Sequence, residues 1–207
     1  MMGLILECAG EPLPDARDQI RRYCGLTWSG GGPEVWAYEY FDSTPTGPDD
    51  LVGPPDLLAS AALHPGFGQA EMVFFNSGGA EACQEWLSGL PRDVDLADAD
   101  EQTVTWLFDL PRISEGIGLS IVSKATHHKR PRLIPLFDRA LVDRYRRTTG
   151  IRGEAAWPVL LRSLRADLAL EGNRRFLGDV RDEIAGELSG PVPSDLRLMD
   201  IAIWMAR

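Results

Sequence analysis

Most of the residues of this chain that could carry chemistry lie within one segment, residues 106–145. Gly116, Ile117 and Gly118 precede a predicted helix over residues 119–127, and backbone N–H groups at such a helix start bind anions such as phosphate. Asp138 follows twenty residues after Gly118, at the predicted start of the next helix. A carboxylate beside an anomeric carbon stabilises the positive sugar that forms when a glycosidic bond breaks, and it activates water. The segment therefore predicts phosphate binding by the glycine turn and catalysis by Asp138.

Both features also have an interpretation that needs no chemistry. An aspartate at the start of a helix is a favoured N-cap, which contributes about 1 kcal/mol to stability. A Gly-x-Gly sequence is also a common turn between two packed helices. Capping and catalysis by Asp138 are compatible, so the sequence leaves both roles open.

Basic residues concentrate in the same part of the chain. Residues 121–152 contain nine basic and two acidic residues, a net charge of +7, whereas the remainder carries −17 and the whole chain −10. Lys129, Arg130 and Arg132 surround a proline on a link that we expect to be exposed, where they would contact phosphates or serve solubility. His127 and His128 could act as acid or base near neutral pH, or could cap helix carbonyls.

A run of aromatic residues could form a pocket for a nucleobase. Trp36, Tyr38 and Tyr40 alternate along the chain, and Asp42 follows as a group that could bind the polar edge of a base. Enzymes that extrude a base from a nucleic acid hold it between aromatic side chains. Packing of these aromatic residues in the core is the alternative.

The same segment is similar to the helix-hairpin-helix DNA glycosylase superfamily, over about forty residues. The shared features are the glycine turn, a helix rich in small residues, a link containing proline and the later aspartate. The resemblance implies that the glycine turn and Ser120 grip a DNA backbone and that Asp138 hydrolyses the N-glycosidic bond of a modified or damaged base, without a cofactor. Members that also cut the strand carry a lysine where this chain has Ser120. The resemblance therefore implies a monofunctional enzyme, with Lys124, one helical turn further on, as the lysine that could substitute. Residues 123–138 also resemble an uncharacterised actinobacterial protein family.

The elements that must position these groups are predicted to be mainly helices, because apolar residues recur at helical spacing along most of the chain. We predict a single α domain over residues 1–207, a helical bundle with a helix-hairpin-helix motif inside residues 98–147. Its last helix, within LRLMDIAIWMA, is predicted to be buried at the centre. A short strand pair is predicted near the N-terminus, with the aromatic run as a candidate strand. The further predicted helices cover residues 12–24, 56–63, 79–90, 98–110, 119–127, 156–170 and 172–188.

The composition limits the classes of protein to which this chain can belong. The chain is 44% hydrophobic and 25% charged, which is typical of a globular protein. It has no basic leader and no run of about eighteen apolar residues, so we expect a cytoplasmic protein without a membrane partner. Cys8, Cys24 and Cys83 are widely spaced and the three histidines show no metal-ligand spacing, so we expect no metal.

Three other functions fit the same sequence. The first is a nucleic-acid-binding protein without catalysis, in which Asp138 serves only as a cap. The second is an acidic inhibitor or immunity-type protein whose −17 remainder contacts a basic partner. The third is an N-glycosidase for free nucleosides or nucleotides, which would suit the acidic composition better than duplex DNA does.

Overall fold

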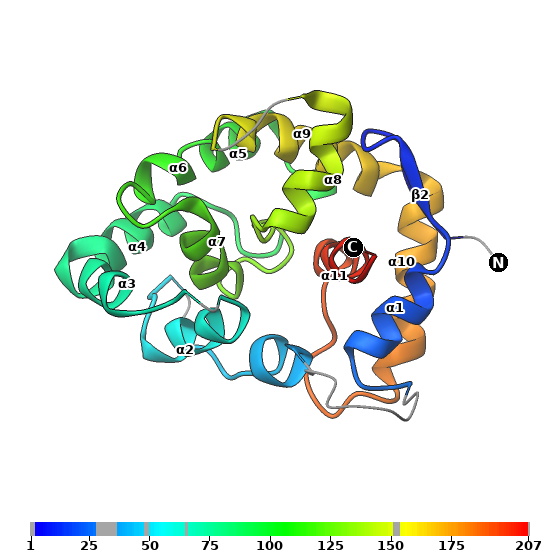
Figure 1. Cartoon of the computed structure of the whole chain (residues 1–207), viewed down its shortest axis with the longest axis horizontal. Helices are drawn as coiled ribbons and strands as arrows, with labels where there is room; N and C mark the ends of the chain where they lie inside the picture. Colours follow the sequence, from blue (N-terminus) through cyan, green and yellow to red (C-terminus); the bar gives the residue numbers. More distant parts are fainter. Residues whose placement is uncertain (1–2, 28–36, 48–49, 65, 151–153, 207) are drawn as a thin grey trace.

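The computed structural model describes residues 3–27, 37–47, 50–64, 66–150 and 154–206. These residues form a mainly helical fold with one two-stranded sheet (Figure 1). The elements, in chain order, are β1 (Leu4–Leu6), β2 (Glu11–Leu13), α1 (Ala16–Tyr23), the π-helical turn η1 (Tyr38–Asp42), α2 (Pro54–Leu63), α3 (Gln69–Phe74), the π-helical turn η2 (Phe75–Gly79), α4 (Ala80–Ser88), the 3-10 turn η3 (Leu96–Asp98), α5 (Glu101–Leu107), α6 (Leu110–Ile113), α7 (Leu119–His127), α8 (Arg139–Thr149), the 3-10 turn η4 (Glu154–Ala156), α9 (Trp157–Ala169), α10 (Glu171–Ala185) and α11 (Asp195–Met205).

Helix α11 lies at the centre of the molecule, as its apolar sequence predicts. It appears end-on in Figure 1, with α2 and α7 on one side and α1 and α10 on the other. It packs against α1, α8, α9 and α10, and residues 196–203 are all buried. A helix that is apolar nearly all round must be surrounded by other elements, and the neighbouring helices bury their own apolar stripes against it.

The helix that carries Ser120 and Lys124 has the predicted bounds, and the helix after Asp138 begins where the sequence predicts. Helix α7 covers Leu119–His127, and α8 begins directly after Asp138. The Asp138 Oδ1 atom accepts a hydrogen bond of 2.9 Å from the Leu141 backbone N–H, so this aspartate is the N-cap of α8. The long amphipathic helices α9 and α10 also agree with the prediction to within a few residues.

The predicted strand in the aromatic run is wrong. Tyr38 and Phe41 are both buried and Tyr40 is 58% exposed, a spacing of three that suits the helical turn η1 rather than a strand. Trp36 lies outside the described residues. The strand pair lies earlier in the chain, where β1 and β2 pair antiparallel with Leu4 opposite Leu13.

No helix in the described ranges is long and apolar enough to cross a bilayer.

The three cysteines are free thiols. Burial raises the pKa of Cys24 and of Cys83 to about 12, which makes both thiols poor nucleophiles.

Candidate functional site

Two pockets meet at the side chain of Arg197, near the start of α11. The first, which we call the arginine pocket, has a volume of about 830 Å³ and is lined by Arg132, Arg181 and Arg197 among other residues. The second, which we call the lysine pocket, has a volume of about 390 Å³ and is lined by Ser120, Lys124 and Asp138. Arg197 lines both pockets and is therefore part of the wall that they share.

The shared wall is a buried cluster held together by charge and aromatic rings. The Arg197 Nε atom donates to Asp42 Oδ1 at 2.6 Å, and the Tyr23 hydroxyl donates to Asp42 Oδ2 at 2.7 Å. The guanidinium also lies 5.1 Å from the centre of the Phe41 ring and 5.3 Å from that of Tyr23. Since the Arg197 and Asp42 side chains are only 5% and 6% exposed, their charges are neutralised within the wall.

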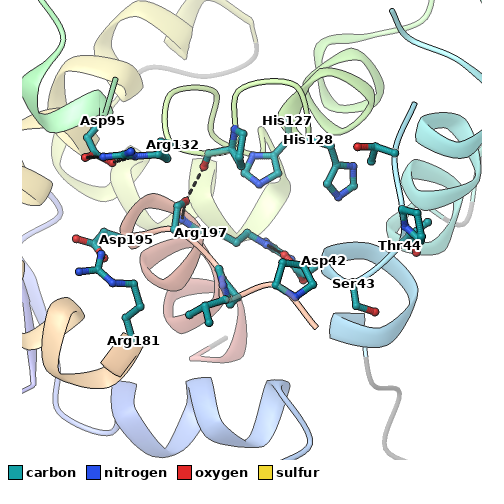
Figure 2. Close-up of a pocket in the computed structure, with 17 residues that line it drawn as sticks. Asp42, Ser43, Thr44, Asp95, His127, His128, Arg132, Arg181, Asp195 and Arg197 are labelled. Carbon is teal, nitrogen blue, oxygen red and sulfur yellow. Dashed lines mark hydrogen bonds and ion pairs between the residues drawn. The ribbon is translucent and has the colours of Figure 1, made fainter. Parts of the chain in front are cut away.

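The arginine pocket is balanced in charge. Figure 2 shows the Arg132–Asp95 and Arg181–Asp195 pairs in one part of this pocket and Asp42 in another. Each arginine that lines the pocket therefore has its own aspartate. The pocket thus offers a ligand little net charge.

Two adjacent histidines from the end of α7 also line the arginine pocket, and each is fixed in one tautomer. His127 Nδ1 lies 2.6 Å from the Ile134 carbonyl oxygen, and His128 Nε2 lies 3.0 Å from that of Phe41. A carbonyl oxygen only accepts, so both of these nitrogens carry the proton. Burial lowers the pKa of His127 to about 3, which keeps this imidazole neutral. His127 and His128 are therefore poor candidates for acid catalysis at neutral pH.

The lysine pocket brings together three residues that the sequence singled out. Ser120 and Lys124 lie one turn apart on α7, and Lys124 Nζ donates to Ser120 Oγ at 2.7 Å and to the Ser120 carbonyl at 3.3 Å. Asp138 reaches the same pocket from the start of α8. Asp138 thus both caps α8 and lines the lysine pocket.

The electrostatics of Lys124 are those of a buried charge. This side chain is 3% exposed, and burial lowers its pKa to about 8, although Asp138 and Asp200 oppose the shift. Among the described residues its hydrogen bonds are to Ser120, and no carboxylate forms an ion pair with it. Within the described ranges, this ammonium is therefore a strong hydrogen-bond donor without an ion-paired carboxylate.

Other residues of the lysine pocket were not predicted. Tyr23 from α1, His64 after α2 and Trp204 from α11 come from three distant parts of the chain. Burial lowers the pKa of His64, and its Nδ1 atom is buried without a hydrogen-bond partner in the described part of the structure. No local sequence signal marks these residues, because only tertiary packing brings them together.

The glycine turn lies between α6 and α7, where the sequence places it, and lines neither pocket. Gly116 and Gly118 have φ angles of +94° and +93°, which side chains other than glycine rarely adopt. Ile117 is partly buried against the core. The helix before the turn, α6, has only 4 residues, and this geometry does not by itself identify a helix-hairpin-helix motif.

The basic link was predicted to be exposed, and for Lys129 and Arg130 that prediction is wrong. Lys129 forms a buried ion pair with Asp56, with 2.8 Å between Nζ and Oδ1. Arg130 is 1% exposed, pairs with Asp50 and donates to the carbonyls of Leu87 and Leu90. Arg132 is exposed, but it pairs with Asp95 and lines the arginine pocket instead. Ion pairing within the protein therefore replaces phosphate contacts for Lys129 and Arg130.

The described residues of the predicted base pocket, Tyr38, Tyr40 and Asp42, do not line one common pocket. Tyr38 is buried and donates to the Pro191 carbonyl, and Tyr40 is exposed on the surface. Asp42 belongs to the shared wall, and none of the three lines the lysine pocket. Trp36 falls in a range that the structure does not describe. The aromatic side chains that do line the lysine pocket are Tyr23 and Trp204.

Metal binding has no support in the described geometry. Within the described ranges, no group of three or more His, Cys, Asp or Glu side chains is arranged to hold a metal ion.

Comparison with known proteins identifies a family over nearly the whole chain. A family model described as a family of unknown function, DUF6308, matches residues 16–207. No curated protein and no solved structure matches the chain. The predicted membership of the helix-hairpin-helix DNA glycosylase superfamily is wrong, because the model that matches residues 106–145 is that of DUF6308. The chain therefore belongs to DUF6308, a family of unknown function.

Proposed function

We propose that this protein is a hydrolase that cleaves an N-glycosidic bond in the lysine pocket, with an unpolymerised nucleoside or nucleotide as substrate. The observation that carries the proposal is that a carboxylate, Asp138, and a buried ammonium, Lys124, face one pocket of about 390 Å³ from two different helices. That volume lies in the range of small-molecule sites, roughly 300–1,000 Å³.

The chemistry follows from the two charges. The bond between the anomeric carbon and the base nitrogen breaks, and its electron pair goes to the base. Asp138 stabilises the positive charge on the sugar and accepts a proton from the water that adds to the anomeric carbon. Lys124 faces the base and donates a hydrogen bond to the atom that gains negative charge. The products are the free base and a sugar with a new hydroxyl group.

We favour an unpolymerised substrate over duplex DNA for two reasons. Lys129 and Arg130, which were expected to contact phosphates, form ion pairs inside the protein. The chain also carries a net charge of −10, which opposes binding to a polyanion.

The test is release of free base, measured by chromatography, from nucleosides, nucleoside monophosphates, and single-stranded and duplex oligonucleotides. Asp138→Asn keeps the helix cap, so we expect a folded protein and a fall in turnover of about 10²–10⁴-fold. Asp143→Asn is the matched control, because Asp143 lies on the same helix and its side chain is 41% exposed. Full turnover in Asp138→Asn would exclude Asp138 from the reaction. Base release from duplex DNA alone would contradict the proposed substrate, and no release from any substrate would contradict the function.

A second candidate function rests on the 2.7 Å hydrogen bond between Ser120 and Lys124. Serine and lysine form nucleophile and base pairs in some acyl-transfer enzymes, where the lysine must be neutral. The two functions predict opposite pH dependence, since the pKa of Lys124 is about 8. Cleavage that needs the ammonium declines above this pH, whereas acyl transfer that needs the amine increases toward it. Labelling of Ser120 by a fluorophosphonate would support acyl transfer.

A further inference from the structure

The two lysines of this chain are both buried, but they differ in how their charge is balanced. Lys129 Nζ lies 2.8 Å from Asp56 Oδ1, and the two side chains are 1% and 0% exposed. Lys124 is 3% exposed, yet in the described structure its partners are the hydroxyl and carbonyl oxygens of Ser120. A buried charge without a counter-ion is costly, and an anionic or strongly accepting group on a ligand would lower that cost.

Donors dominate the rest of the lysine pocket. Its cationic side chains are Lys124, Arg139 and Arg197, and its carboxylate is Asp138. Asp42 neutralises Arg197 inside the wall, and the 92% exposed Arg139 forms a surface ion pair of 3.3 Å with Asp143 on its own helix. Lys124 is therefore the buried positive charge that lines the pocket, and Arg139 adds a second positive charge at the surface.

The geometry of an ammonium restricts what can face it. An ammonium group has three N–H donors and no acceptor, and Ser120 takes two of them. The remaining donor needs a lone pair on the ligand. A carbonyl oxygen supplies one, whereas an amino group would place a second donor against the first and leave both without an acceptor.

We propose that the pocket accepts bases whose edge toward Lys124 carries a carbonyl oxygen, and that such a base departs as its anion. This inference rests on the proposed function. The chemical class is that of oxo heterocycles, such as uracil, hypoxanthine and xanthine, as opposed to the amino heterocycles adenine and cytosine.

The bond-breaking step is balanced without another reactant. The electron pair of the glycosidic bond stays on the ring nitrogen and is delocalised onto the carbonyl oxygen, where the Lys124 ammonium stabilises it. Lys124 keeps its proton throughout. Water adds to the anomeric carbon and gives one proton to Asp138, which then releases it to solvent, and the released base takes up one proton from solvent. Amino bases hold negative charge less well, so they gain less from the ammonium.

The experiment compares pairs of substrates that differ in one group. Inosine and adenosine differ at one ring position, as do uridine and cytidine. We expect kcat/KM for the oxo member of each pair to exceed that of the amino member by at least about 10²-fold, the size of effect that one well-placed donor has. Lys124→Met, which keeps an unbranched side chain and removes the charge, should reduce turnover of the oxo member by about 10²–10³-fold. The kcat/KM values of the two members of each pair should then be similar. Equal turnover of oxo and amino members by the unaltered protein would overturn the inference while the function stood.

A binding measurement separates this inference from the function on which it rests. Calorimetric titration with free hypoxanthine and free adenine needs no turnover. We expect hypoxanthine to bind more tightly than adenine, and Lys124→Met to abolish the difference. If no nucleoside released its base but this preference appeared, the proposed function would fail and the pocket preference would hold. Equal binding of the two bases to the unaltered protein would contradict the preference.

Discussion

At the scale of single residues, the contrast between Lys124 and Lys129 shows that burial alone does not define a functional charge. Lys129 joins two parts of the fold through Asp56 and also donates to the Gly47 carbonyl at 3.1 Å. Lys124 connects only to Ser120 on its own helix, within the described residues. The first lysine therefore stabilises the fold, whereas the second adds a cost that the fold must offset.

This contrast predicts opposite effects on stability. Lys129→Met removes the cation beside the buried Asp56 carboxylate, whose Oδ2 atom still accepts from the Gly53 backbone N–H, so we expect a loss of about 3–5 kcal/mol. Lys124→Met removes a buried charge whose pKa is already lowered, so we expect a gain of about 1–3 kcal/mol at pH 7. Urea unfolding followed by circular dichroism measures both. Destabilisation by Lys124→Met would show that its charge is balanced in a way that the hydrogen bonds do not reveal.

The sequence predicted some of the site residues and not others. The difference lies in how far apart in the sequence the contacting residues are. Ser120 and Lys124 are four residues apart on one helix, so their proximity follows from helix geometry alone. The partners of Lys129 and Arg130 are Asp56 and Asp50, which lie more than seventy positions away in the sequence. Sequence alone does not identify such distant acidic partners, so the run of basic residues was predicted to be exposed.

At the scale of elements, the start of α7 depends on a glycine. Gly118 is the N-cap of the helix and has φ of +93° and ψ of 142°. A side chain there would meet no neighbouring atom within 4 Å, so the constraint comes from the backbone rather than from packing. Because Ser120 and Lys124 lie in the first two turns of α7, the conformation of this glycine determines the position of both residues.

We therefore expect Gly118→Ala to reduce stability by about 1–3 kcal/mol, because only glycine adopts this combination of φ and ψ readily. Gly178→Ala is the control, because Gly178 lies inside α10 and a side chain there would meet only the Arg181 guanidinium, at 4.0 Å. Alanine in that helix interior should increase stability by about 0.5–1 kcal/mol. Thermal denaturation of the two variants provides the comparison, and equal effects would mean that the φ angle of Gly118 is not what matters.

Long amphipathic helices were predictable because their apolar spacing repeats over several turns, as in α9 and α10. The short elements α3 and α6, with 6 and 4 residues, offer too few repeats for such a pattern. The aromatic run fits both a strand and a turn of helix over its short length. Burial of Tyr38 and Phe41 against the rest of the protein decided between them.

At the scale of the whole molecule, the central helix carries an acid inside the core. Asp200 is 5% exposed, and its Oδ2 atom accepts a hydrogen bond of 3.1 Å from the Leu136 backbone N–H. Burial raises its pKa to about 7, with Asp138 and Asp42 acting in the same direction and Arg197 opposing. The folded protein thus holds this proton over a pH range in which the unfolded chain releases it.

The consequence is a pH-dependent loss of stability. The ordinary pKa of an aspartate is about 4, so the unfolded chain binds fewer protons than the folded one between about pH 4 and pH 7. This group therefore destabilises the fold as pH increases through that range, by at most about 1.4 kcal/mol per pH unit. Asp200→Asn cannot ionise and can still accept from Leu136. We expect its stability relative to the unaltered protein to increase steadily from pH 4 to pH 7, as measured by urea unfolding. A difference that did not change with pH would show that Asp200 titrates normally.

Since the Arg197 side chain is a partition between the two pockets, neither cavity can be redesigned alone. A substitution of Arg197 that enlarges one pocket also changes the wall of the other. A compound that moves the Arg197 guanidinium from within one pocket likewise changes the shape of the second pocket. Independent engineering of the two cavities would first require a neutral replacement of equal bulk for the Arg197–Asp42 pair.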